Sequence, residues 1–150
     1  MFNLKNILVP TDFSSLSHSA LDYAKDLADN MNATIHILHV IEKSIPFIPD
    51  KQKLNEEDIS ISLEIEAKKH LSVLTREIEN ESDVRVIGVI RHGIDYEEIT
   101  NFANEIQTDL IVIATHGRTG IMHSLLGSVA EKVIQHSKCP VLVIPSREER

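Results

Sequence analysis

Residues 6–31 read NILVPTDFSSLSHSALDYAKDLADNM, and they contain the pattern from which the fold class can be predicted. Its first four residues form a short, mostly apolar run closed by Pro10, which is typical of a buried strand. Apolar residues then recur at spacings of three and four, which indicates one face of a helix. They are Leu16, Ala20, Tyr23, Ala24, Leu27 and Met31. Ser14 or Ser15 would cap this helix, because a serine hydroxyl accepts from first-turn N–H groups.

The same alternation of strand and helix continues along the chain. Apolar runs of strand length cover residues 34–40, 84–90, 110–114 and 141–144, and helical spacing covers residues 59–78, 99–106 and 129–134. Residues 41–55 contain two prolines and no clear period, so we predict a surface loop there. Such alternation is typical of a mostly parallel sheet. We therefore predict one α/β domain over residues 1–150: a doubly wound, Rossmann-like, five-stranded parallel sheet of order 3-2-1-4-5 with four flanking helices.

Composition argues against several classes of function. The formal net charge is −8, so the chain lacks the basic excess typical of nucleic-acid binding. No apolar run is long enough to span a membrane and no secretory signal is visible, so we expect a cytoplasmic protein without a membrane partner. Cys139 is the only cysteine, which excludes an internal disulfide and fits a reducing compartment. The histidines show no zinc-motif spacing.

Two predicted strand ends carry residues suited to a ligand. The first strand ends in Pro10, Thr11 and Asp12, and the fourth ends in residues 114–120, ATHGRTG. In open parallel sheets, ligands bind beyond the carboxyl ends of the strands, where the strand order reverses. If the first and fourth strands are neighbours, both segments face one crevice.

The segment after the fourth strand has the features of a phosphate site. Gly117 lets backbone amides approach an anion, Arg118 adds a cation, and Gly127 with Ser128 stands at a predicted helix N-terminus. The alternative is that the glycines only form a turn and Ser128 caps the helix, with Glu131 at capping-box spacing. Asp95 and Glu98 have the same spacing at the start of the third helix.

The polar residues of the crevice each have two interpretations. Asp12 either accepts ribose hydroxyls and holds a divalent cation, or forms an Asx turn at the strand end. Thr11 either donates to phosphate or belongs to that turn. His116 either touches the ligand or packs as an ordinary loop residue.

At this point the residues resemble the universal stress protein family. The resemblance begins with residues 5–12, KNILVPTD, continues through Ser17, Ala20 and Ala24, and is strongest over residues 109–145, DLIVIATHGRTGIMHSLLGSVAEKVIQHSKCPVLVIP. Members that bind ATP have a glycine, two residues, a glycine, nine residues, and then glycine with serine or threonine. The last three positions of that pattern are Gly117, Gly127 and Ser128, whereas its first position is Ala114.

The resemblance implies an adenine-nucleotide site, with ATP as the first candidate and AMP or ADP as alternatives. Asp12 would also hold Mg²⁺ or Mn²⁺ with the nucleotide, and the Val40 main chain would bind the adenine edge. Together with His116, the site residues would be Pro10, Thr11, Asp12, Val40, Ala114, Gly117, Arg118, Gly127, Ser128 and Val129.

Three functions follow as hypotheses. The first is a dimeric, nucleotide-binding regulatory module of the stress response, without dedicated catalysis. The second is slow ATP hydrolysis or self-phosphorylation, with Asp12 organising the metal. The third is a structural dimer without nucleotide binding, which Ala114 favours. Residues Val141, Leu142, Val143 and Ile144 should form an apolar edge strand, and a bare edge favours pairing with a second copy.

Overall fold

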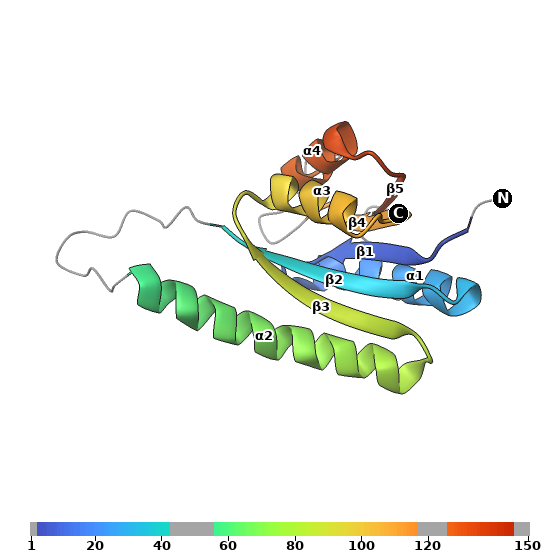
Figure 1. Cartoon of the computed structure of the whole chain (residues 1–150), viewed down its shortest axis with the longest axis horizontal. Helices are drawn as coiled ribbons and strands as arrows, with labels where there is room; N and C mark the ends of the chain where they lie inside the picture. The colour runs from blue at the N-terminus through green and yellow to red at the C-terminus, as the bar shows by residue number, and fades with distance from the viewer. Residues whose placement is uncertain (1–2, 43–55, 117–125, 146–150) are drawn as a thin grey trace.

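The computed structural model describes residues 3–42, 56–116 and 126–145 (Figure 1). Five parallel strands form one sheet in the order β3-β2-β1-β4-β5. The strands are β1 (Asn6–Pro10), β2 (Thr34–Ile41), β3 (Arg85–His92), β4 (Leu110–Ala114) and β5 (Val141–Ile144). The helices are α1 (Ser15–Met31), α2 (Glu56–Glu81), α3 (Asp95–Glu105) and α4 (Ser128–His136). The predicted fold class and strand order are therefore confirmed.

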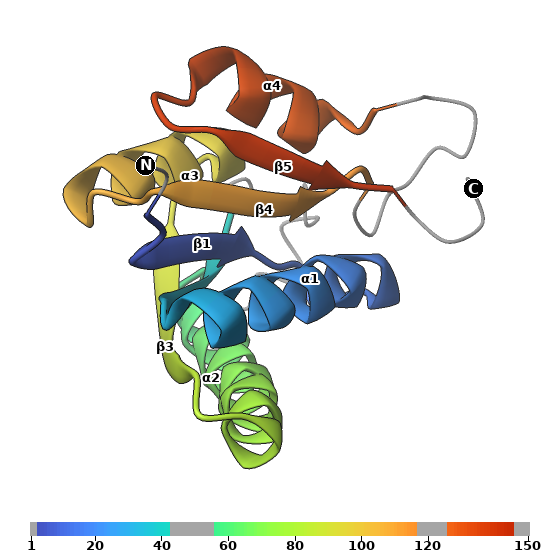
Figure 2. The same ribbon diagram turned by 90° about the vertical axis from the view of Figure 1, so that its right-hand side faces the viewer.

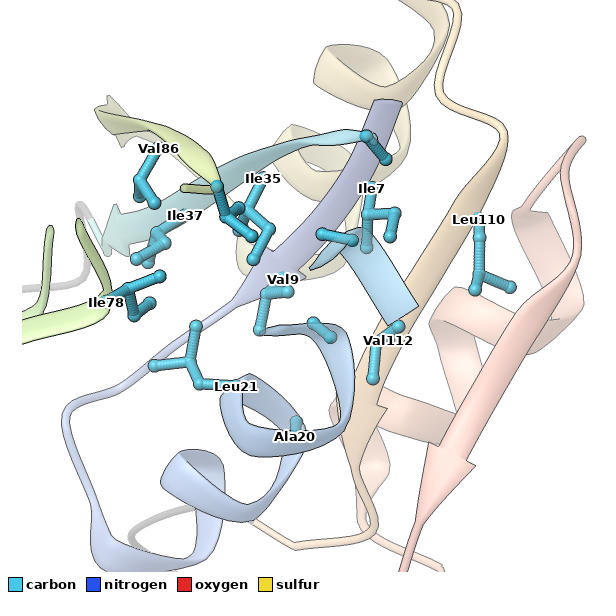
Figure 3. Packing of buried hydrophobic residues seen from close by; sticks show 14 of the residues in the cluster. Ile7, Val9, Ala20, Leu21, Ile35, Ile37, Ile78, Val86, Leu110 and Val112 are labelled. Carbon is cyan, nitrogen blue, oxygen red and sulfur yellow. The ribbon is translucent and has the colours of Figure 1, made fainter. Parts of the chain in front are cut away.

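Two apolar layers cover the two faces of the sheet. Successive side chains of a strand point to opposite faces, so Ile7 and Val9 pack on one side while Leu8 packs on the other. The first layer joins Ile7 and Val9 to α1 and α2. Figure 3 shows Ala20 and Leu21 of α1 beside Val9. The second layer joins Leu8 to α3 and α4. Figure 2 shows the resulting arrangement, with α1 and α4 on opposite sides of the sheet.

The register of the strands brings their carboxyl ends to one edge. Pro10 pairs with Leu38 of β2, and the Thr11 N–H donates to the Leu38 carbonyl at 2.9 Å. On the other side, Ala114 pairs with Ile144, and the Thr115 N–H donates to the Ile144 carbonyl at 3.0 Å. The polar segments after β1 and β4 therefore emerge from neighbouring strands at the same edge.

The helix caps agree only partly with the sequence. Ser14 caps α1 and accepts from the Ser17 N–H, as one of the two predicted serines should. The capping-box prediction for α3 is wrong, because the N-cap is Ile94, which has no side-chain acceptor. Glu98 instead lies over Gly93, where a Cβ would come within 2.6 Å of Glu98 Oε1.

The first turns of α2 are less buried than the periodicity suggested. Ala67, Leu71, Leu74 and Ile78 pack against the sheet, but 45% of Leu63 stays exposed. Figure 1 gives the reason, since the N-terminal turns of α2 project past the strands. In the predicted loop at residues 41–55, Ile41 instead ends β2, and residues 43–55 lie outside the described residues. Among the described helices, none combines the length and the hydropathy that crossing a bilayer requires.

Candidate nucleotide-binding cleft

A cleft of about 600 Å³ lies beyond the carboxyl ends of β1, β2 and β4. Its walls are the turn after β1, the end of β2, the end of β4 and the first turns of α3 and α4. This volume is within the range of small-molecule sites, and the position is the one where open α/β sheets bind ligands. The cleft also lies between β1 and β4, where the strand order reverses.

Every predicted site residue that the structure describes lines this cleft. They are Pro10, Thr11, Asp12, Val40, Ala114, His116, Gly127, Ser128 and Val129. Gly117 and Arg118 lie outside the described residues. The structure thus brings the two predicted segments together, while the role of each residue toward a ligand stays a prediction.

The cleft has further lining residues that the sequence interpretation missed. They include Ser17, His39, Glu42, Asp95, Ile99, Leu126 and Glu131. His39 directly precedes Val40 in β2, and Asp95 follows the turn at Gly93, so their closeness to strand ends was a usable signal. Ser17 lies within a helix, and only the packing of α1 against β1 and the turn after it brings it to the cleft.

The turn after β1 is held by its own side chains. The Thr11 hydroxyl lies 3.0 Å from Ser17 Oγ and accepts from the Phe13 N–H at 3.0 Å. The Ser17 hydroxyl donates to the Ser14 carbonyl at 2.8 Å, so the proton between Ser17 and Thr11 comes from Thr11. Thr11 is buried, and its hydroxyl is engaged in these hydrogen bonds within the protein. Of its two interpretations, the structure supports the turn.

Asp12 forms the predicted Asx turn, and its contact with a ligand stays a prediction. Its Oδ1 accepts from the Ser14 N–H at 2.9 Å, which is the Asx turn. The same half-buried side chain lines the cleft. An ionised carboxylate has about four lone-pair sites, so one carboxylate can close an Asx turn and also bind a second donor or a cation.

The opposite wall is the N-terminus of α4, and its cap is Gly127 rather than Ser128. The Gly127 N–H donates to the Thr115 carbonyl at 2.6 Å, so this amide is used inside the protein. A Cβ on Gly127 would lie 2.6 Å from the same oxygen, which explains why glycine is required there. The first α-helical hydrogen bond is from the Glu131 N–H to the Gly127 carbonyl. The amides of Ser128, Val129 and Ala130 precede it, at the positive end of the helix dipole.

The described walls of the cleft are acidic. Asp12, Glu42, Asp95 and Glu131 line it, and none of the described lining residues is a lysine or an arginine. Within residues 3–42, 56–116 and 126–145, no group of three or more histidines, cysteines or carboxylates is placed to hold a metal ion. Mg²⁺ typically takes one or two carboxylates together with substrate phosphates, so Asp12 alone fits a cation carried by a nucleotide.

Comparisons with known proteins agree with this fold. The family model described as the Universal stress protein family matches residues 3–145. Universal stress protein MJ0531 of Methanocaldococcus jannaschii is 36% identical over 146 residues, which cover 96% of this chain and 85% of the relative. The solved structure of hypothetical protein MJ0577, from the same organism, superposes with a TM-score of 0.83 at 32% identity, covering 96% of this chain and 97% of that one.

A further solved structure is a universal stress protein in complex with cAMP, with a TM-score of 0.70 and 22% identity over 95% of this chain and 98% of that one. At that identity it supports the shared fold only. The class of protein defined here is an open α/β domain with a ligand-sized cleft at its strand-order reversal. The chain belongs to the universal stress protein family.

Proposed function

We propose that this chain binds an adenine nucleotide in the cleft between the turn after β1 and the N-terminus of α4. ATP is the first candidate, and AMP and ADP are the alternatives. The observation that carries the proposal is the meeting, around about 600 Å³, of an acidic turn, a strand end and a helix N-terminus. The complex of a family member with cAMP makes adenine nucleotides the class to test first.

The two walls of the cleft are suited to different ends of the nucleotide. The first-turn amides of α4 favour negative charge, so phosphates belong at Ser128 and Val129, with Gly117 and Arg118 as further candidates. The Gly127 amide is already bonded to Thr115, so its contribution would be close backbone packing rather than donation. The Val40 main chain is the candidate for the adenine edge, with Pro10, Ala114 and His116 beside the base and sugar. Asp12 would accept ribose hydroxyls or hold Mg²⁺ or Mn²⁺ with the phosphates.

Isothermal titration of the protein with ATP, ADP, AMP and GTP tests the proposal. We expect saturable binding of at least one adenine nucleotide, with GTP weaker, and mass spectrometry of the purified protein should identify any nucleotide that co-purifies. Absence of binding by all adenine nucleotides would support the alternative of a structural dimer. The hydrolytic alternative would be established instead if the protein released phosphate from ATP in the presence of Mg²⁺ and the Asp12→Ala variant did not.

The functional unit we propose is a homodimer formed through β5 in the cytoplasm. β5 is an edge strand, and 37% of Leu142 is exposed. An exposed apolar edge favours pairing with a second copy around a two-fold axis. Leu142→Lys would place like charges near that axis, so we expect it to shift sedimentation from dimer to monomer. An unchanged dimer in this variant would exclude β5 as the interface.

A further inference from the structure

Three aromatic rings from separate elements stack behind the wall of the cleft. The Phe13 ring lies between His39 of β2 and His70 of α2, with centroid distances of 4.3 Å and 4.8 Å and interplanar angles of 30° and 26°. Phe13 itself belongs to the turn after β1. The stack therefore joins the turn, the sheet and α2, a helix that contributes none of the described lining residues of the cleft.

Phe13 holds an unusual backbone conformation in this stack. Its φ is 65°, in the left-handed region that a bulky side chain rarely adopts. Such a conformation persists only where its surroundings hold it. Here they are the hydrogen bond from the Phe13 N–H to Thr11 Oγ1 and the ring contacts on both sides. Because Phe13 directly follows Asp12, relaxation of its backbone would also move the Asp12 carboxylate.

His39 connects the stack to the cleft. Its Nδ1 lies 2.8 Å from the Thr11 carbonyl oxygen, which can only accept, so the proton is on Nδ1. His39 lines the cleft, whereas Phe13 does not, so the Phe13 ring supports the side chain of His39 from behind. On the far side, His70 Nε2 lies 3.8 Å from Glu66 Oε1, one helical turn earlier.

We infer that Phe13 is a positioning residue for the nucleotide site, and that α2 supports it through His70. The stack fixes the orientation of His39 and the backbone that presents Asp12, so it sets nucleotide affinity without touching the nucleotide. A change in the position of α2 would alter affinity through the same rings. This inference rests on the proposed nucleotide-binding function.

The test uses four variants of the full chain. Phe13→Leu keeps an apolar side chain and removes the ring, and Phe13→Tyr keeps the ring. His70→Ala removes the outer ring at a side chain that is 50% exposed, so it should not impair folding. Lys69→Ala changes the neighbouring exposed residue of α2 and is the matched control.

Two readouts separate positioning from general stability. The first is the NMR signal of the His39 Nδ1 proton in the protein without nucleotide, and the second is titration with ATP and AMP. We expect Phe13→Leu to lose the Nδ1 signal and to bind nucleotide about tenfold more weakly, and His70→Ala about threefold more weakly, as the strength of one aromatic contact implies. Phe13→Tyr and Lys69→Ala should match the wild type.

The outcomes separately test the positioning role of Phe13, the link to α2 and the proposed nucleotide binding. Wild-type affinity together with an intact Nδ1 signal in Phe13→Leu would overturn the positioning role. If Phe13→Leu does not fold, His70→Ala decides, and wild-type behaviour there overturns the link to α2. If the wild type binds no adenine nucleotide, the proposed function fails, while the Nδ1 signal of the free variants still tests whether the stack fixes His39.

Discussion

The two walls of the cleft are organised in different ways. In the turn after β1, side chains satisfy one another and the backbone, as Thr11 with Ser17 and Asp12 with Ser14 show. At the N-terminus of α4, backbone geometry dominates, and within the described residues no side chain caps the helix. There Gly127 packs directly on Thr115, and the first-turn amides of the helix follow.

This difference indicates separate roles for the two walls in the proposed nucleotide site. The wall that satisfies its own polar groups should keep its conformation without a ligand, and it presents the Asp12 carboxylate. The wall whose amides have no acceptor within the helix gains most from an anion. Substitutions should therefore act through shape on the α4 side and through hydrogen bonds on the β1 side.

The largest effect should come from Gly127→Ala. The new Cβ would lie 2.6 Å from the Thr115 carbonyl oxygen, a backbone atom, so the backbone itself would have to shift. We expect the free energy of unfolding to fall by about 3 kcal/mol, the upper range for overpacking, and nucleotide binding to be lost. Thermal denaturation and titration measure both.

Gly88→Ala is the matched control for that substitution. Its Cβ would lie 3.4 Å from Leu71 Cβ, an ordinary contact distance, in β3 away from the cleft. Binding should remain at the wild-type level in this variant. Equal damage from both substitutions would mean that the close approach at Gly127 has no special role.

A smaller effect should follow from Thr11→Val, which keeps the shape and removes the hydroxyl. The Phe13 N–H and Ser17 Oγ both lose a partner in a buried turn. We expect a loss of about 1–2 kcal/mol in the free energy of unfolding. A double-mutant cycle with Ser17→Ala should show coupling, because the two hydroxyls interact directly. Simple additivity would contradict a turn held by its own side chains.

Removal of divalent cations should affect the binding of ATP and AMP differently. The described walls carry Asp12, Glu42, Asp95 and Glu131, which repel an uncompensated triphosphate. We expect chelation of Mg²⁺ to weaken ATP binding about tenfold and AMP binding much less, since a divalent cation held at Asp12 would offset the charge of the additional phosphates. Titration with and without EDTA measures this, and Asp12→Asn should reduce the difference. Equal effects on both nucleotides would exclude a cation at Asp12.

The smallest effect concerns pH and a region away from both walls. Burial lowers the pKa of His36 from its ordinary value of 6.5, and the nearby positive charge of Arg85 lowers it further. The unfolded chain therefore takes up a proton near pH 6.5 that the folded chain resists, so stability should decrease as the pH falls below 6.5. Urea denaturation at neutral and mildly acidic pH should show a weaker decrease in His36→Gln. Nucleotide affinity at neutral pH should not change in this variant.

Much of the fold was predictable because its signals are local. Runs such as residues 110–114 and the helical spacing after β1 fix which segments are strands and helices, and the parallel alternation constrains their order. The residues at the ends of β1 and β4 indicated the cleft for the same reason. The caps of α3 and α4 were not predictable in this way, since the observed caps, Ile94 and Gly127, have no side-chain acceptor.

Local sequence signals are enough to give the alternation of strands and helices, the strand ends that carry polar residues, and the family pattern around Gly127 and Ser128. The folded chain was needed to see that Ser17 bonds to Thr11, that Gly127 packs on Thr115, and that Phe13 lies between two histidine rings. The physical reason is distance along the chain. Periodicity and turn chemistry act over a few residues, whereas these contacts depend on how separate elements pack.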